Sequence, residues 1–274
     1  MAVTMAEITK LRHMTGAGLM ACKKALVEAN EDMDAAIEII RKKGQAVAAK
    51  REDRVASEGC VIADGKDGFA AIVALKCETD FVASNAGFKA LAQKIFNAAF
   101  SAKAKSLDEV KAITIDGKSV SDLIIEEVGK TGEKMELGAY ECLEAPSVGF
   151  YNHFNGKLST IVGLSLPGID AEVGKEVAMQ AASMNPVAVC REEVPENIVN
   201  EELTVGREKA LEEGKPAAIV DKIAQGRLEK FYKETVLMEQ EYTKDAKLNI
   251  ASYLNQQAKG LKAISFKRVN LNED

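Results

Sequence analysis

The stretch ALKCETDFVASNAGFKALAQKIF, residues 74–96, decides how the middle of this chain folds. Apolar residues suited to a β-strand run up to Cys77, and a helical pattern of apolar residues begins after Asn85. Between them the letters TDFV put a carboxylate and a large aromatic side chain at a strand-to-helix junction. The pattern leaves open whether Phe81 points into a core or outward toward a partner.

Both interpretations of Phe81 have support in the neighbouring residues. Phe88 lies seven positions later, so one unbroken helix would put both rings on the same buried face. Asn85 is a good N-cap and Gly87 a poor interior residue, and both favour a break between the two rings. Asp80 suits either a local helix cap or a contact with a partner. From the residues alone, core and interface weigh equally.

Length and composition describe an ordinary globular protein. The 274 residues are enough for about two or three compact units, each with its own core. Charged residues make up 28% and hydrophobic residues 47%, while aromatic residues reach only 5% and tryptophan is absent. An exposed phenylalanine is therefore conspicuous. The net charge of -6 argues against nucleic-acid binding, because proteins of that class carry a dominant basic field.

Five cysteines are scattered along the chain, without any CxxC pair, and only two histidines accompany them. We therefore expect no zinc site and no other metal or cofactor. Lone cysteines with apolar neighbours suit a reducing cytoplasm, where they act as small buried hydrophobes. The N-terminal residues do not resemble a secretory signal, and no apolar run is long enough to span a bilayer. A soluble cytoplasmic protein is expected.

Residues 1–55 have the pattern of three short helices and a linker. Thr4 and Glu7 have the spacing of a capping box, which predicts that the first helix begins directly after Thr4. Glycine-rich and polar breaks separate this helix from the second and third, and Gly44 is expected to end the third. The polar, alanine-rich segment that follows is interpreted as a partly helical linker.

Two later segments share one order of predicted elements. In 56–142 and again in 143–186, two apolar runs flank a glycine-containing turn, and a helical pattern follows. We interpret this as a repeated strand-turn-strand-helix unit, because neither half could cover its own sheet alone. The segment KAISFKRV, within 235–274, alternates like a final edge strand. The fold class expected is α+β.

Residues 187–234 are expected to form a projecting helical hairpin. The helical pattern is broken once, at Gly214-Lys215-Pro216, where glycine ends one helix and proline begins the next. Apolar residues expected to line the two arms are Leu203, Leu211, Ile219, Ile223 and Phe231.

Motifs for catalysis are incomplete. The letters GKT at 129–131 match the end of a P-loop, but its first glycine position is occupied by Ile124. A nucleophilic thiol would have to be Cys77 beside a histidine, yet Cys77 ends an apolar run, which favours a buried inert thiol. We therefore expect a binding protein and not an enzyme, with a thiol enzyme as one alternative.

Two long motifs resemble signatures of the translation elongation factor Ts family. They are ITKLRHMTGAGLMACKKALVEAN at 8–30 and CETDFVASNAGF at 77–88, and the resemblance extends over nearly the whole chain. It implies a guanine-nucleotide exchange factor for elongation factor Tu. It also implies a ubiquitin-associated-like domain at 1–55, a core of two subdomains and a coiled-coil protrusion. The helical C-terminal module of some relatives is not expected, since the chain ends soon after its last predicted strand.

The resemblance also implies which residues meet the partner. Asp80 and Phe81, flanked by Thr79 and Val82, match a family motif that inserts into the GTP-binding domain of elongation factor Tu. There it disturbs the region that holds the magnesium ion and the nucleotide phosphates. Further positions that match family contacts are Arg12, Leu19, Met20 and Lys23 in the N-terminal domain, and Val128, Gly129 and His153 in the core.

Alternatives remain for several of these assignments. Leu19 and Met20 could be core residues of the helical bundle, and His153 could be a hairpin residue satisfied by solvent. The whole chain could be a ubiquitin-associated-like adaptor that only holds partners together. The resemblance implies no direct contact with nucleic acid or membrane, and the sequence does not decide whether two copies pair through the core or the hairpin.

Overall fold

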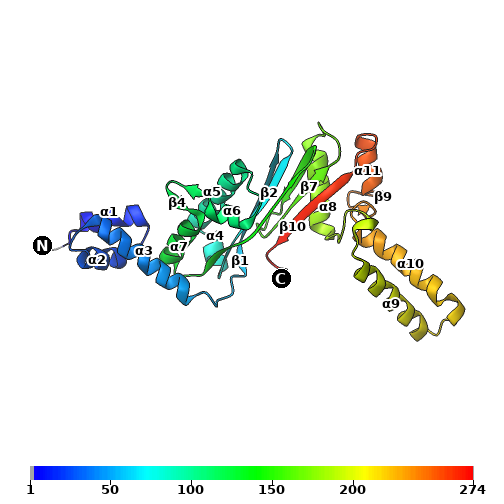
Figure 1. Cartoon of the computed structure of the whole chain (residues 1–274), viewed down its shortest axis with the longest axis horizontal. Helices are drawn as coiled ribbons and strands as arrows, with labels where there is room; N and C mark the ends of the chain where they lie inside the picture. Colours follow the sequence, from blue (N-terminus) through cyan, green and yellow to red (C-terminus); the bar gives the residue numbers. More distant parts are fainter. Residues whose placement is uncertain (1–2, 274) are drawn as a thin grey trace.

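A computed structural model describes residues 3–273, so residues 1–2 and 274 of the first and last predicted segments lie outside the described part. The molecule is elongated, with a helical bundle at the N-terminal end, two sheets with their helices in the middle, and a helical hairpin at the far end (Figure 1). The last strand returns from the hairpin side to the middle of the molecule. Helices and antiparallel sheets combine into an α+β fold, as predicted.

Three helices form the bundle: α1 (Met5–Thr15), α2 (Leu19–Glu28) and α3 (Met33–Lys50). The predicted capping box is confirmed, since the Thr4 side chain accepts from the Glu7 amide and the Glu7 carboxylate accepts from the Thr4 amide. The bundle core is small, and its fully buried side chains include Leu11, Cys22 and Leu26. A core of this size holds three short helices together without large aromatic side chains.

The prediction that Gly44 ends the third helix is wrong. Helix α3 continues through Gly44 to Lys50, and Gly44 is buried. A Cβ atom at this position would lie 3.3 Å from the carbonyl oxygen of Ile125 on a neighbouring helix. Gly44 therefore serves close packing between two helices, and its low helix propensity is overridden by that contact.

Six long strands form two antiparallel three-stranded sheets. The first sheet has the order β1-β2-β5, and the second has the order β10-β7-β6. The strands are β1 (Glu58–Lys66), β2 (Phe69–Cys77), β5 (Met135–Glu144), β6 (Ser147–Asn152), β7 (Leu158–Leu164) and β10 (Ala263–Asn270). Asp67 and Gly68 join β1 to β2 with φ of 51° and 76°, which is the two-residue turn that matches the twist of a hairpin. In each sheet a hairpin is followed by a helix, and a later strand pairs with the hairpin's second strand.

The two sheets face each other, and helices cover their outer faces (Figure 1). In β2, Val73 and Leu75 pack toward the helices, whereas Ile72 packs against Ile161 of the second sheet. Helices beside the first sheet are α4 (Asp80–Ser84), α5 (Ala86–Ala102), α6 (Leu107–Ala112) and α7 (Val120–Thr131), and those beside the second are α8 (Ala171–Met184) and α11 (Ile250–Gln257). Strand β2 is thus buried on both faces, which explains its nearly unbroken apolar sequence.

The predicted hairpin consists of α9 (Glu196–Glu212) and α10 (Ala217–Thr235). The expected seam of large apolar residues is wrong for Leu211 and Ile219, which are 56% and 42% exposed, whereas Leu203, Ile223 and Phe231 are half-buried. The buried positions of the two arms are instead mostly small: Gly206, Ala210, Val220, Ala224 and Leu228. Small side chains let the helices approach closely, and Leu211 and Ile219 lie on the outside.

The remaining short elements were not predicted. They are β3 (Thr114–Ile115), β4 (Lys118–Ser119), β8 (Glu241–Tyr242), β9 (Asp245–Asn249) and a 3₁₀ turn at Arg191–Glu193. The two-residue strands β3, β4 and β8 carry no readable period, which is why the sequence did not reveal them. Within residues 3–273, no helix combines the length and the apolar character needed to cross a membrane.

Candidate functional site

The TDF motif forms a one-turn helix that stands between β2 and α5. Thr79 is the N-cap of α4, and its hydroxyl accepts a hydrogen bond of 3.4 Å from the Val82 amide. Asp80 is exposed, and Phe81 is 85% exposed. The helix contains no fully buried residue, although Val82 packs partly against the core of the first sheet. The motif therefore presents its acidic and aromatic side chains to solvent.

The predicted break between the two phenylalanines is confirmed. Asn85 ends α4 and caps α5 by accepting a hydrogen bond of 2.7 Å from the Gly87 amide. Phe88, one turn further along, is fully buried against β2. The interpretation of Phe81 as a core residue is wrong, because the change of direction at Asn85 separates the two rings.

Two glutamates hold the residues that precede α4. The Glu133 carboxylate accepts two hydrogen bonds from Thr79, one of 3.1 Å from its amide and one of 2.7 Å from its hydroxyl. Glu78 accepts from Arg51 at 2.8 Å and from the Lys134 amide at 2.6 Å. Although partial burial opposes ionisation, these two donors hold the pKa of Glu78 below its usual value. The sequence analysis assigned no role to either glutamate: Glu78 lies within the motif at 77–88 but was not singled out, and Glu133 lies in no recognisable motif.

The N-terminal candidates lie on the outside of the bundle. Arg12 and Lys23 are exposed, and so are Leu19 and Met20, with relative exposures of 40% and 66%. The alternative that Leu19 and Met20 form the bundle core is therefore wrong. Cys22 fills the core position on α2 instead. Two exposed apolar side chains beside two cations leave a surface that suits a protein partner.

Val128 and Gly129 lie in the last turns of α7, where they have different environments. Val128 is buried in the core of the first sheet, so its side chain does not reach the surface. Its contribution to partner binding would be indirect, by fixing the position of α7. Gly129 is exposed on one side and meets α3 on the other, where a Cβ atom would lie 3.0 Å from the Gly44 Cα. The GKT letters thus belong to a helix C-terminus, whose carbonyl groups do not cradle a phosphate.

His153 lies in the turn between β6 and β7. Its Nδ1 atom is 2.9 Å from the Tyr151 hydroxyl, so a side chain and not only solvent satisfies it. Phe154 follows and is 93% exposed, and the ring centroids of His153 and Phe154 are 4.4 Å apart. The sequence analysis missed Phe154, although an aromatic residue inside an Asn-Gly turn was a readable signal of exposure.

The turn with His153 and the TDF motif lie at one end of the sheets. Strand β1 links them, since Glu58 pairs with Cys77 at the end of β2 and also forms a 2.7 Å ion pair with Lys157. The Val61 amide donates to the Gly156 carbonyl at 2.8 Å. The N-terminal candidates occupy a separate part of the molecule, on the helical bundle (Figure 1).

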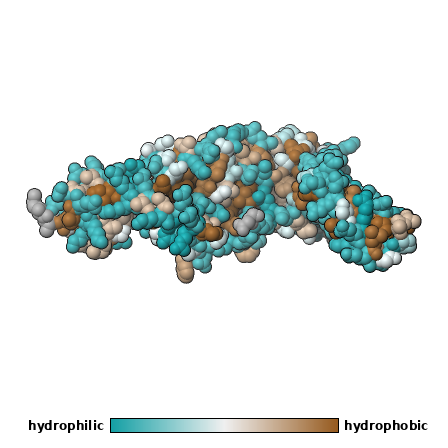
Figure 2. Space-filling model, turned by 60° about the horizontal axis from the view of Figure 1, so that its bottom comes forward, coloured by the Kyte–Doolittle hydropathy of each residue, from teal (hydrophilic) through white to brown (hydrophobic). Residues whose placement is uncertain are grey.

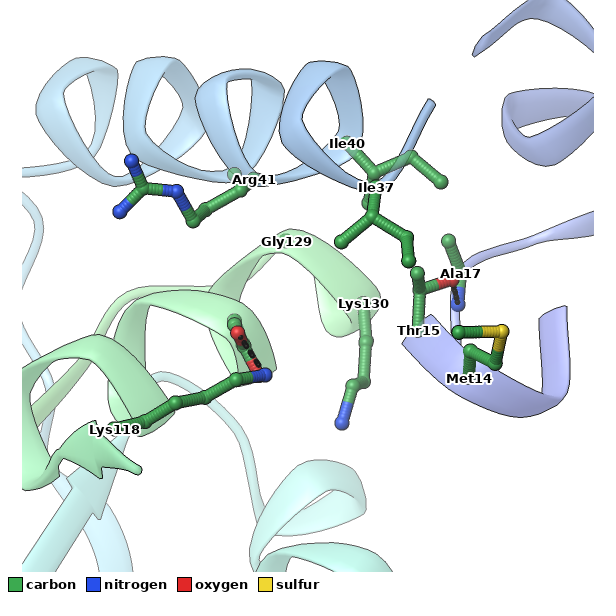
Figure 3. A pocket seen from close by; sticks show the side chains of 11 residues that line it. Met14, Thr15, Ala17, Ile37, Ile40, Arg41, Lys118, Gly129 and Lys130 are labelled. Atoms are coloured by element: carbon green, nitrogen blue, oxygen red, sulfur yellow. Dashed lines mark hydrogen bonds and ion pairs between the residues drawn. The ribbon is translucent and has the colours of Figure 1, made fainter. Parts of the chain in front are cut away.

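Cys77, the candidate nucleophile of the thiol-enzyme alternative, is buried at the end of β2. Burial, with the charges of Glu133 and Glu58 adding to it, raises the pKa of Cys77 to about 12, so this thiol stays protonated near neutral pH. Within residues 3–273 no cluster of three or more histidine, cysteine or acidic side chains could hold a metal ion. A cavity of about 40 Å³ lies between α1, α3 and α7 (Figure 3).

The comparisons with known proteins agree with these observations. A family model described as Elongation factor TS matches residues 78–273. This chain belongs to the elongation factor Ts family. The match to that family model begins one residue before Thr79, so it includes the whole TDF helix. A role in translation elongation, within protein biosynthesis, follows from membership of the elongation factor Ts family.

Relatives named Elongation factor Ts match the chain over its full length. The one from Porphyromonas gingivalis is 53% identical and is covered completely, as is this chain. Those from Azobacteroides pseudotrichonymphae and Bacteroides fragilis are 48% and 41% identical, each with 99% of both chains covered. The helical bundle, which precedes the match to the family model, is thus included in the similarity to these relatives.

Proposed function

We propose that this protein is a guanine-nucleotide exchange factor, which binds elongation factor Tu in its GDP form and speeds the release of GDP. The observation that carries the proposal is the 85% exposure of Phe81 at the start of α4, directly after Asp80. Burying a phenylalanine side chain is worth about 1.5–3 kcal/mol, so the free chain forgoes this stabilisation at Phe81. A partner that receives the ring would recover it.

The proposed mechanism needs no covalent step. Much of the affinity of a GTP-binding protein for its nucleotide comes from the magnesium ion and from backbone amides around the phosphates. Asp80 and Phe81 insert into the GTP-binding domain and displace these elements, which lowers the affinity of the partner for GDP. By linkage, GDP must lower the affinity of the partner for this protein by the same factor. GTP then binds to the emptied partner and completes the cycle in the cytoplasm.

The candidate residues on the helical bundle would contribute to binding the partner more than to displacing its nucleotide contacts. Leu19 and Met20 on the bundle, flanked by Arg12 and Lys23, offer an exposed apolar surface with cations at its rim. Interfaces of this composition bury their apolar centre and keep charged residues at the edge. We assign these residues to holding the partner, and Asp80 and Phe81 to opening its nucleotide site.

The test measures the release of a fluorescent GDP from purified elongation factor Tu. Wild type should speed release strongly, and the Asp80→Ala and Phe81→Ala variants should each lose most of that effect. A loss of about tenfold or more is expected, because truncating a central aromatic contact costs about 2 kcal/mol. Val55→Ala, which removes another exposed apolar side chain, should behave as wild type.

Two outcomes would contradict the proposal. If wild type binds elongation factor Tu without speeding release, the protein is an adaptor that only holds its partner. If Phe81→Ala is folded and matches wild type in rate, the exposed ring is not the displacing group. Circular dichroism and the thermal midpoint of each variant separate these results from a failure to fold.

A further inference from the structure

The helix that carries Phe81 is too small to fix its own direction. It has only five residues, none of them fully buried, and its one side-chain cap is the Thr79 hydroxyl. A helix of this length is not stable by itself, so its orientation must come from the residues before it and after it. After it, the chain enters α5, which is anchored in the core by Phe88. Before it, two hydrogen bonds from Thr79 end on the carboxylate of Glu133.

Glu133 is itself held by the end of α7. That helix ends at Thr131 and is capped by Gly132, which has a φ of 76° and whose amide donates to the Val128 carbonyl. The Glu133 amide donates to the Thr131 hydroxyl at 3.3 Å, and β5 begins two residues later. The carboxylate therefore reaches Thr79 from a segment fixed on both sides.

The neighbouring Glu78 extends this support to the bundle. Its carboxylate accepts hydrogen bonds from the side chain of Arg51, which is the C-cap of α3, and from the backbone amide of Lys134. The Lys134 ammonium group in turn donates to the carbonyls of Glu52 and Arg54, just after α3. Helices α3 and α7 also cross at Gly44 and Gly129, where α3 passes over the last turns of α7 (Figure 3). One contiguous set of contacts thus connects the bundle, α7 and the start of α4.

We propose that Glu133 is a positioning residue for nucleotide exchange, which holds Thr79 so that Asp80 and Phe81 project in one fixed direction. This inference rests on the proposed function, because it explains how the displacing side chains are presented. A partner that meets a preordered side chain pays less for ordering it, and displacement requires correct placement. Without Glu133 the protein should still bind, yet it should open the nucleotide site poorly.

The first experiment needs no partner. The chain contains no tryptophan, so Phe81→Trp introduces a single tryptophan at the site, whose fluorescence can be excited selectively beside the five tyrosines. Time-resolved anisotropy of this reporter is compared in three backgrounds: native, Glu133→Ala and Glu144→Ala. Glu144 is the matched control, since it is an exposed, ion-paired carboxylate at the far end of β5. We expect fast local motion to increase in Glu133→Ala alone.

The second experiment measures GDP release in chains that keep Phe81. Glu133→Ala should lower the maximal rate by about tenfold, while the concentration for half-maximal effect changes by less than about twofold. Glu133→Gln should recover most of the rate, because its amide can accept from the Thr79 amide and donate to the hydroxyl. Glu144→Ala should match wild type.

Two results would overturn the inference. One is unchanged anisotropy in Glu133→Ala, which would mean that the site stays ordered without this carboxylate. The other is a rise in the half-maximal concentration with the maximal rate intact, which would make Glu133 a residue for affinity only. If wild type itself fails to speed GDP release, the proposed function fails, whereas the anisotropy still decides whether Glu133 orders α4.

Discussion

At the scale of single residues, Glu78 is the point where the end of α3 meets the strand-to-helix junction. Its side chain is only 16% exposed. The Arg51 guanidinium and the Lys134 backbone amide both donate hydrogen bonds to its carboxylate. An ionised carboxylate in such a place stabilises the fold, while a protonated one loses much of its attraction to Arg51. The lowered pKa of Glu78 therefore predicts how stability depends on pH.

Glu78→Gln should lower the free energy of unfolding at pH 7 by about 1 kcal/mol. Because the folded pKa lies below the ordinary value of 4.5, the contribution is complete above that pH and is lost as pH falls through the folded pKa. Urea unfolding at pH 7 and at acidic pH measures the difference from wild type. A difference that persists unchanged in acid would contradict this assignment. Glu38→Gln, which breaks an exposed pair with Arg41, is the control and should change little.

Residues that act through the local backbone could be predicted from the sequence, and residues that act across the fold could not. The Thr4–Glu7 capping box and the Asn85 cap involve neighbours within three positions, so their spacing alone reveals them. Glu133 acts on Thr79 across 54 positions of sequence. No spacing rule links such residues, which is why the support of the TDF motif became visible only in the structure.

At the scale of elements, two helix pairs meet through small residues. Gly206 of α9 would place a Cβ atom 3.1 Å from the Ala224 Cα of α10, and Gly129 of α7 approaches Gly44 of α3 similarly. Hydrophobic periodicity finds large apolar residues, so the sequence analysis chose Ile219 for the hairpin seam and made Gly44 a helix end. Close packing of backbones produces no hydrophobic signal, and this explains both errors.

Gly129→Val should lower stability by about 1–3 kcal/mol, because the new side chain must push α3 away from α7. Gly226→Val is the matched control: Gly226 is also inside a helix, α10, but has no atom within 4 Å of its Cβ position. That control should stay within about 0.5 kcal/mol of wild type. Thermal unfolding measures the stability, and small-angle scattering measures whether the bundle moves. Equal effects of the two substitutions would show that the crossing carries no special packing.

At the scale of the whole molecule, the two sheets bring separate exposed groups to one end. Asn152 joins them, since its side chain exchanges two hydrogen bonds of 2.8 Å with the Ala63 backbone and so completes the edge of β1. Hydrophobic residues are otherwise scattered on the surface, with a further group at the end of the hairpin (Figure 2). The repeated order of elements was predictable, because each unit lies within a short segment. How the units face each other was not, because it depends on contacts between distant segments.

This arrangement predicts that the partner's surface extends from α4 to the turn that holds Phe154. Phe154→Ala should weaken binding to elongation factor Tu by about tenfold, because an exposed aromatic side chain close to a proposed contact can be buried on association. Titration calorimetry measures the affinity. The maximal rate of GDP release should stay near wild type, since Phe81 and Asp80 remain in place. Met184→Ala, which trims a 43% exposed side chain at the end of α8, is the control. Unchanged affinity in Phe154→Ala would confine the interface to the first sheet and the bundle.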